Sequence, residues 1–335
     1  MAAVTETRLS ALGRGRIRAT TGVRAASLLA LLIVTAGFWI FFAAFAGGFL
    51  SDFNLFGLLR FAAIGILIGF AQMVVLSIGD MNLAVGAVGG AAGMFAGWLM
   101  AMGLPVLLAA MLAIALGCML GLGGGVLIRV TGLNSFIVTL ATASLITGAL
   151  LIITQARPFS SLPPSLTDFA QVELPGTPIS PFFAVMLLIG VGLFLLYRNT
   201  SVGREMLAIG GNRRAALMSG LAVGRVVLLT HLLSGLLASV AGVMSIAANN
   251  TASPGLGSDW VLASFVAPAI GGTLLSGGLV SVIGTVIGGI LVATLGSGLL
   301  LVGVDNFWLE VCLGVVLLLA VGLDRLTRAV GAATE

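Results

Sequence analysis

Apolar residues form long runs along most of the chain, separated by short segments rich in Gly, Pro and charged residues. The runs are about 20 residues long, the length that a helix needs to cross the roughly 30 Å hydrocarbon core of a bilayer. The alternating segments of a membrane barrel are absent from the sequence. We therefore predict an all-α, polytopic membrane helix bundle of about ten transmembrane helices. The spans are expected at 25-48, 61-79, 82-101, 105-128, 135-155, 181-197, 226-248, 260-276, 279-302 and 307-323.

Composition supports burial in a membrane. Apolar residues make up 59% of the 335 residues and charged residues only 8%, against about 25% charged in an average globular domain. The 48 glycines are about twice the average frequency. Small residues let membrane helices approach closely where no hydrophobic force drives them together. The bundle is therefore expected to be tightly packed.

The basic residues are all arginines, and they set the orientation. If the N-terminus is cytoplasmic, 13 of the 15 lie in cytoplasmic segments, and only Arg60 and Arg157 lie outside. Cytoplasmic loops carry such an excess of positive charge. We therefore predict cytoplasmic N and C termini, a basic cytoplasmic tail at 1-24, a transmembrane domain at 25-325 and a cytoplasmic tail at 326-335.

Two sets of four spans, at 61-155 and 226-323, cover similar lengths but start on opposite sides of the membrane, as inverted repeats do. Each set contains a glycine-interrupted segment, at Gly79 to Gly93 and at Ser264 to Gly278. Broken helices in corresponding halves point to a translocation path. The alternative is that these glycines only permit close packing.

The residues for enzyme chemistry are absent or unsupported. Without a lysine the chain cannot form an ATP-binding P-loop, and no metal cluster or catalytic set is recognisable. His231 could relay a proton, but a packing role is favoured because its own span contains no acid. Cys118 and Cys312 lie in apolar runs and are interpreted as small buried residues. We predict a non-enzymatic protein without a cofactor.

Acidic residues are concentrated at the predicted span ends: Asp52, Asp80, Asp259, Asp305, Glu310 and Asp324. Ion-driven transporters use ionisable residues inside their spans, so this distribution argues against coupling to protons or sodium. Energy for uphill transport would then come from a partner.

The stretch AIGGNRRAALMSGLAV, residues 208 to 223, interrupts the apolar pattern. Gly210 and Gly211 are expected to break the chain, and Asn212 to cap a short helix that spans 213 to 218 and ends at Gly220. Ala216 and Leu217 would present an apolar patch beside solvent-exposed arginines. Such a helix would move both flanking spans with it; the alternative is a charged loop that only fixes topology.

The chain resembles the membrane permeases of bacterial ABC importers of the ribose and simple-sugar type, which are related to the branched-chain amino acid permeases. The resemblance covers about residues 60 to 325. It rests on four motifs in order: GDMNLAVGA at Gly79 to Ala87, SFIVTLATASLITGALLIIT at Ser135 to Thr154, TSVGREMLAIGGNRRAALMSGLAV at Thr200 to Val223, and IGGTLLSGGLVSVIGTVIGGIL at Ile270 to Leu291.

This resemblance implies a multi-pass protein of the bacterial plasma (inner) membrane, in contact with membrane lipid. The implied partners are two cytoplasmic ABC ATPase subunits that use the ATP, a periplasmic or lipoprotein substrate-binding protein, and a second permease subunit, identical or paralogous; no nucleic acid is implied. Segment 198-225 would be the coupling loop. Its implied ATPase contacts are Gly211, Asn212, Arg213, Arg214, Ala216, Leu217, Ser219 and Gly220.

The substrate pathway is expected near the broken segments. Where the family carries an acid this chain has Asn82, with Asp80 two residues earlier, and Arg214 replaces a frequent acid of the coupling turn. The expected cargo is a monosaccharide, a pentose or hexose. Alternatives are a polyol, a nucleoside, a branched-chain amino acid, or a secondary transporter without an ATPase. Pathway candidates are Asn82, Asp80, Phe136, Asn249, Gly271 and Gly272.

The arginine distribution generates a prediction about orientation. A cysteine at Thr167 should react with a membrane-impermeant thiol reagent added outside intact cells, and a cysteine at Ser201 should react only after the cells are opened. The reverse labelling pattern would contradict the ten-span topology. Because Cys118 and Cys312 are native thiols, both are first replaced by alanine.

Overall fold

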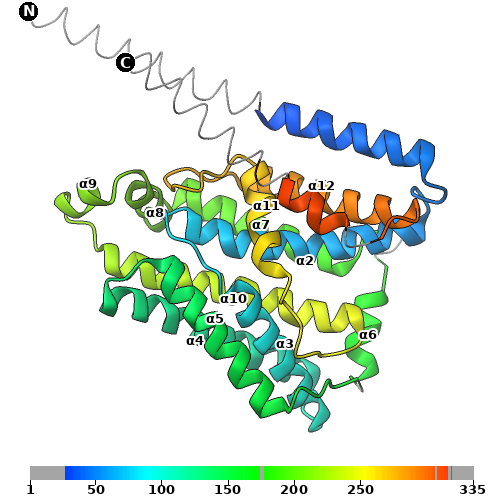
Figure 1. The fold of residues 1–335 in the computed structure, drawn as a ribbon, viewed down its shortest axis with the longest axis horizontal. Coiled ribbons are helices and arrows are strands. Elements are labelled where there is room, and N and C mark those ends of the chain that lie inside the picture. Colours follow the sequence, from blue (N-terminus) through cyan, green and yellow to red (C-terminus); the bar gives the residue numbers. More distant parts are fainter. Residues whose placement is uncertain (1–26, 161, 174–176, 306–307, 316–317, 319–335) are drawn as a thin grey trace, which may run out of the picture.

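The computed structural model describes residues 27–160, 162–173, 177–305, 308–315 and 318, and its fold is drawn in Figure 1. Within these residues every extended regular element is a helix, and a single isolated β-bridge joins Phe159 to Ala252. The predicted all-α fold class is confirmed. The predicted tails, 1-24 and 326-335, lie outside the described residues.

Seven helices of the described chain are long and apolar enough to cross a membrane. They are Ser27–Phe45, α2 (Asp52–Leu76), α4 (Val106–Thr131), α5 (Ser135–Thr154), α7 (Pro181–Asn199), α10 (Val223–Asn249) and α12 (Val282–Leu301). Two apolar helices are shorter, α3 (Val85–Ala101) and α11 (Trp260–Ile270). Three short helices lie between longer ones: α6 (Pro164–Gln171), α8 (Ser201–Gly211) and α9 (Arg213–Met218).

Three predicted spans differ clearly from the structure in extent. The predicted span 61-79 is the helix Asp52–Leu76, which begins nine residues earlier than expected. The predicted span 82-101 begins as a helix only at Val85, and residues 80–84 are not helical. The predicted span 260-276 ends at Ile270, and 271–281 is irregular. The interruptions follow from backbone conformation, because Gly79, Gly272 and Gly277 have φ of +79°, +84° and +90°, which glycine adopts at little cost. Of the predicted span 307-323, residues 308–315 are helical, and most of the remainder lies outside the described residues.

Helices α2 and α10 occupy the centre of the molecule (Figure 1). The more N-terminal of the two, α2, packs mainly on α11 and α12 from the C-terminal part of the chain, whereas α10 packs mainly on α3 and α4 from the N-terminal part. The two central helices also contact each other. The N-terminal and C-terminal parts are therefore interleaved in one core.

Glycine makes the contact between α4 and α10 possible. A Cβ added at Gly235 would overlap the main chain of Gly117, and one added at Gly121 would overlap the carbonyl of His231. The two main chains thus lie against each other without intervening side chains. This is how small residues support helix packing in membranes.

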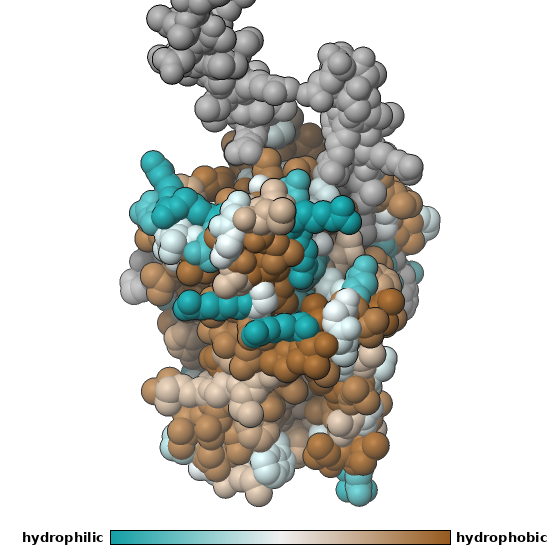
Figure 2. Space-filling view, turned by 90° about the vertical axis from the view of Figure 1, so that its left-hand side faces the viewer, coloured by the Kyte–Doolittle hydropathy of each residue, from teal (hydrophilic) through white to brown (hydrophobic). Residues whose placement is uncertain are grey.

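Arginines gather at one end of the bundle, which we call the α9 end. It carries α8, α9, the C-terminus of α4 and the start of α10, and Figure 2 shows hydrophilic side chains on this face. The opposite end carries α6, where Arg60 donates to the Ala170 carbonyl over 3.5 Å. Exposed arginines of the α9 end are Arg129, Arg198, Arg204, Arg213, Arg214 and Arg225.

The α4–α10 contact predicts the effect of adding one methyl group. Gly235→Ala should lower the stability of the protein in detergent by about 1–3 kcal/mol, because overpacking forces helices apart. The matched control is Gly123→Ala, since Gly123 has open space around its Cα and alanine is the better helix former there. Thermal unfolding midpoints give the measurement. Equal midpoints for the two variants would contradict the contact.

Candidate functional site

Helix α9 has the local structure that its sequence predicts. Asn212 has extended backbone angles, and its side chain accepts a hydrogen bond from the Ala215 N–H over 3.0 Å, as an N-cap does. The chain leaves the helix through Gly220, whose φ of +78° is left-handed. The predicted helix at 213–218, its cap and its glycine stop are confirmed.

The break before α9 lies elsewhere than predicted. Gly210 and Gly211 do not interrupt the chain, because both belong to α8 and the change of direction occurs at Asn212. Helix α8 itself was not predicted. Its signal is Thr200, whose hydroxyl caps the helix by accepting from the Gly203 N–H over 3.1 Å.

The apolar patch on α9 also differs from the prediction. Ala216 is buried within the chain, whereas Leu217 is 55% exposed and Met218 is 92% exposed. Ala216 faces inward because the first turn of α9 lies against the bundle, so its prediction as part of the exposed patch is wrong. The accessible apolar surface is formed by Leu217 and Met218, beside the exposed Arg214 and Ser219.

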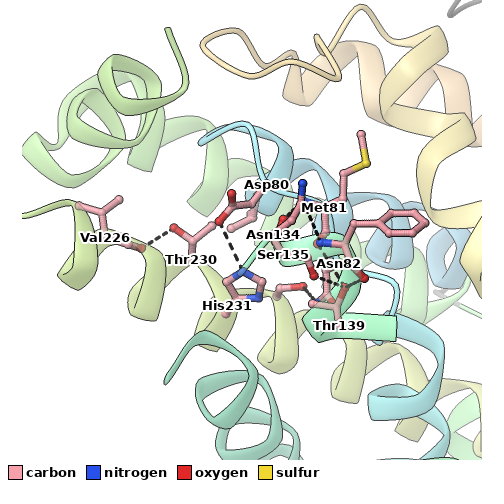
Figure 3. Close-up of polar contacts among 12 residues, drawn as sticks. Asp80, Met81, Asn82, Asn134, Ser135, Thr139, Val226, Thr230 and His231 are labelled. Carbon is pink, nitrogen blue, oxygen red and sulfur yellow. Dashed lines mark hydrogen bonds and ion pairs between the residues drawn. The ribbon is translucent and has the colours of Figure 1, made fainter. Parts of the chain in front are cut away.

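The irregular segment 80–84 is held by hydroxyls of α5. The N–H of Met81 donates to Ser135 Oγ over 3.0 Å, and the N–H of Leu83 donates to Thr139 Oγ1 over 3.0 Å (Figure 3). Non-helical backbone at membrane depth is tolerated only where protein groups satisfy it. The motif beginning at Ser135 therefore supplies hydrogen-bond partners for the backbone of the motif beginning at Gly79.

Asn82 ties the same segment to two central helices. Its Nδ2 donates to Ser234 Oγ of α10 over 3.0 Å, and its Oδ1 accepts from the Ala84 N–H over 2.9 Å. With its amide oriented to satisfy both groups, Gln72 of α2 donates to the Asn82 carbonyl over 2.8 Å and accepts from the Asn82 N–H over 3.3 Å. Asn82 is 4% exposed, so its side chain is buried and stabilises the conformation of the segment through these hydrogen bonds.

Asp80 lies between a cation of α9 and the imidazole of α10. Its Oδ1 is 3.4 Å from Arg213 Nη1. Its Oδ2 is 3.9 Å from His231 Nε2, and Figure 3 shows the carboxylate and the imidazole facing each other. His231 is 1% exposed, and neither its Nε2 nor Asp80 Oδ2 has a hydrogen-bond partner among the described residues. This proximity could not be predicted from the pattern within one span, because the acid near His231 belongs to another segment.

The other pathway candidates are spread over the molecule. Phe136 is 45% exposed. It follows Ser135 on α5, whose hydroxyl contacts the segment of Asp80 and Asn82, so Phe136 lies beside that segment. Gly271 is buried against Gly284 of α12, and Gly272 has open space around its Cα. Asn249 is exposed at the end of α10 remote from α9. The structure thus brings together only Asp80, Asn82 and Phe136.

A pocket of about 250 Å³ opens between α3, α5 and the segment before α11. Its lining is largely apolar, with the hydroxyls of Thr147 and Ser258 as side-chain polar groups. The sequence analysis did not select this pocket, because its walls come from three separate parts of the chain. Further lining residues include Leu83, Ala143, Leu150 and Val261.

Comparison with known proteins identifies the family of this chain. Residues 54–321 match the model of a family described as the permease component of branched-chain amino acid transport systems. The chain belongs to this family. It is therefore a multi-pass membrane permease of a bacterial ABC importer, a transport subunit rather than an enzyme. ATPase and binding-protein partners are general to such importers.

Several relatives align over most of the chain. The ribose import permease protein of Bacillus subtilis is 36% identical over 83% of this chain and 86% of its own length. The D-allose transport system permease protein of Escherichia coli is 31% identical over 83% of this chain and 85% of its own length. The ribose import permease protein of Escherichia coli is 29% identical over 89% and 92%. No solved structure matches the chain significantly.

The hydrogen bonds of Asn82 predict the effect of replacing it. Asn82→Leu should lower stability by about 1–3 kcal/mol for each buried group left unpaired, and should reduce transport while leaving the importer assembled. Thermal unfolding in detergent and uptake in vesicles give the two measurements. Asn199→Leu is the control, because Asn199 is exposed at the end of α7. Unchanged unfolding and uptake for Asn82→Leu would contradict its role in shaping the segment.

Proposed function

We propose that this chain is the translocating subunit of an ATP-driven importer for a monosaccharide, a pentose or hexose. The observation that carries the proposal is the 36% identity with a ribose import permease over 83% of the chain. The similarity to a D-allose permease over the same share supports a sugar more generally. The chain itself would hold no cofactor, and ATP would be bound by the ATPase.

The α9 end would face the cytoplasm and receive the ATPase. Two exposed apolar side chains, Leu217 and Met218, project from a helix surrounded by arginines. A short helix with a few exposed anchors suits insertion into a groove of a partner protein. The opposite end, with α6, would receive the substrate-binding protein. This placement agrees with the excess of arginine expected on the cytoplasmic side.

Helix α5 would line the pathway. It is long enough to span the membrane, yet few of its residues are buried within this chain. Ser144 and Thr147 are exposed on it, and Thr147 also lines the pocket beside α3. These hydroxyls could exchange hydrogen bonds with the hydroxyls of a sugar. A second permease copy would cover this side, so that the solute passes between the two subunits.

The interleaved packing supports alternating access. Helices α2 and α10 are the first helices of the two parts that were predicted to be inverted repeats. Helix α2 packs on α11 and α12 of the other part, and α10 packs in the corresponding way on α3 and α4. Related repeats that rock against each other are a common transport architecture. The family description also favours one other cargo, a branched-chain amino acid, which the same uptake assay would detect.

The test uses the permease reconstituted in vesicles with its ATPase and binding protein. We expect ATP-dependent uptake of a labelled pentose or hexose, and no ATP hydrolysis by the permease alone, since the chain has no lysine for a P-loop. Uptake of leucine but of no monosaccharide would refute the sugar. Hydrolysis by the permease alone at the rate of the complete importer would refute the transport-subunit role.

The docking surface has a separate test. Met218→Asp should abolish copurification of the ATPase, because it places a charge where an apolar side chain would be buried. The fold should be unaffected, since Met218 is 92% exposed. Ala222→Asp is the control, because it adds the same charge at an exposed position just beyond α9. Equal copurification with both variants would place the docking surface elsewhere.

A further inference from the structure

We infer that Asp80 and Arg213 act as positioning residues that make α9 and the irregular segment 80–84 move together, so that ATPase motion reaches the pathway through this pair. The inference rests on the proposed function and adds a connection within the permease. It is carried by an ion pair between these two elements and by main-chain contacts of the elements next to them, the end of α8 and the turns at 77–79 and 277–278.

The main-chain contacts form a cluster that we call the glycine junction, made of Gly79, Gly210, Gly277 and Gly278. The Gly278 N–H donates to the carbonyl of Ser77, at the end of α2, over 3.1 Å. A Cβ added at Gly277 would lie 2.7 Å from Gly79 Cα and 3.0 Å from Gly210 Cα. The end of α8 therefore lies against the turn at 77–79, just before segment 80–84, and against the irregular segment 271–281.

The glycine junction leaves no room for side chains. A Cβ added at Gly210 would overlap the Ser77 carbonyl and the Gly278 nitrogen. Gly211, the next residue, lies against the junction with its main chain, because a Cβ added at Gly278 would lie 2.8 Å from Gly211 Cα, whereas a Cβ added at Gly211 itself would meet open space. A displacement of α8 would press directly on the turns at 77–79 and 277–278, because no flexible side chain lies between them.

The ion pair continues this connection into α9. Asp80 follows Gly79 directly, and Arg213 is the first residue of α9. Arg213 Nη1 lies 3.4 Å from Asp80 Oδ1, and the two side chains are 47% and 10% exposed. A partly exposed ion pair adds little to stability. Its consequence is positional, since it fixes the start of α9 relative to the irregular segment.

The carboxylate of Asp80 also faces α10. Its Oδ2 faces His231 of α10 at 3.9 Å, and Asp80 is only 7% exposed. The buried acid belongs to the irregular segment and Arg213, on the solvent side, belongs to α9, so the pair joins these two elements. Arg214 is exposed and has no ion-pair partner among the described residues. The two adjacent arginines therefore serve different purposes: Arg213 faces the permease, and Arg214 is free to face a partner.

The experiment is a double-mutant cycle in the reconstituted importer. Asp80→Asn, Arg213→Gln and the double variant are compared for copurified ATPase, solute taken up per ATP hydrolysed, and stimulation of hydrolysis by the binding protein. We expect the ATPase to remain bound and uptake per ATP to fall about fivefold or more. The double variant should equal the single variants, because removing either partner breaks the same connection.

Arg129→Gln is the matched control, since it removes one exposed arginine from the same end of the molecule but lies on α4, outside segment 198-225; it should retain the wild-type ratio. Effects of Asp80→Asn and Arg213→Gln that multiply in the double variant would overturn the inference, as would a wild-type ratio in either single variant. Loss of bound ATPase in Arg213→Gln would also overturn it, by making Arg213 a docking residue.

Failure of the proposed function gives a different result. A wild-type complex that hydrolyses ATP but imports no monosaccharide would refute the proposed cargo alone. The inference is then decided by the stimulation of ATP hydrolysis that the binding protein causes. Asp80→Asn and Arg213→Gln should lose this stimulation together, whereas unchanged stimulation in both would overturn the inference.

Discussion

Each backbone N–H and C=O group in the hydrocarbon region of a membrane needs a hydrogen-bond partner within the protein or a water-filled cavity, and the arrangement of this molecule depends on that requirement. Helices meet it by themselves. Segment 80–84 does not form a helix, so Ser135 and Thr139 supply hydroxyls for its N–H groups. The irregular segment therefore depends on α5, one of the spans of which little is buried within this chain. The chemistry of the backbone thus places the break next to the proposed pathway.

Close packing of the helices is a second consequence of the membrane environment. Lipid supplies no hydrophobic force between spans, so helices gain by van der Waals contact when small residues let them approach. Gly117 and Gly121 provide this between α4 and α10, and Gly271 and Gly284 provide it between α11 and α12. The contact between α4 and α10 joins the two interleaved parts, and the contact between α11 and α12 lies within the C-terminal part. Movement in such a bundle is expected at its irregular segments, where few helical hydrogen bonds need to break.

Local signals made much of the structure predictable. The helix at 213–218 could be found because Asn212 and Gly220 act on neighbouring residues, and the spans could be found from their length. Prediction failed where distant residues decide the outcome. Ala216 was expected to be exposed, but the bundle covers it. Gly210 was interpreted as a helix break because glycine often is one; here it remains helical and is needed for a contact with Ser77.

The candidate site shows the same division. Asp80 and Asn82 could be selected from their motif, yet the proximity of Asp80 to Arg213 and His231 depends on how α9 and α10 fold back onto the segment. The pocket has walls from three parts of the chain, so no single motif indicates it. A sequence identifies elements with particular properties, whereas long-range packing decides which of those elements meet.

The glycine junction and the ion pair should respond differently to ionic conditions. Mobile ions screen charges near the surface over about 8 Å at physiological ionic strength, and Arg213 is 47% exposed, so concentrated salt weakens its attraction to Asp80. The contacts among Gly79, Gly210 and Gly277 depend on the shape of the main chain, which salt does not screen. In an organism whose cytoplasmic osmolarity fluctuates, the steric route would keep its strength while the electrostatic one varied.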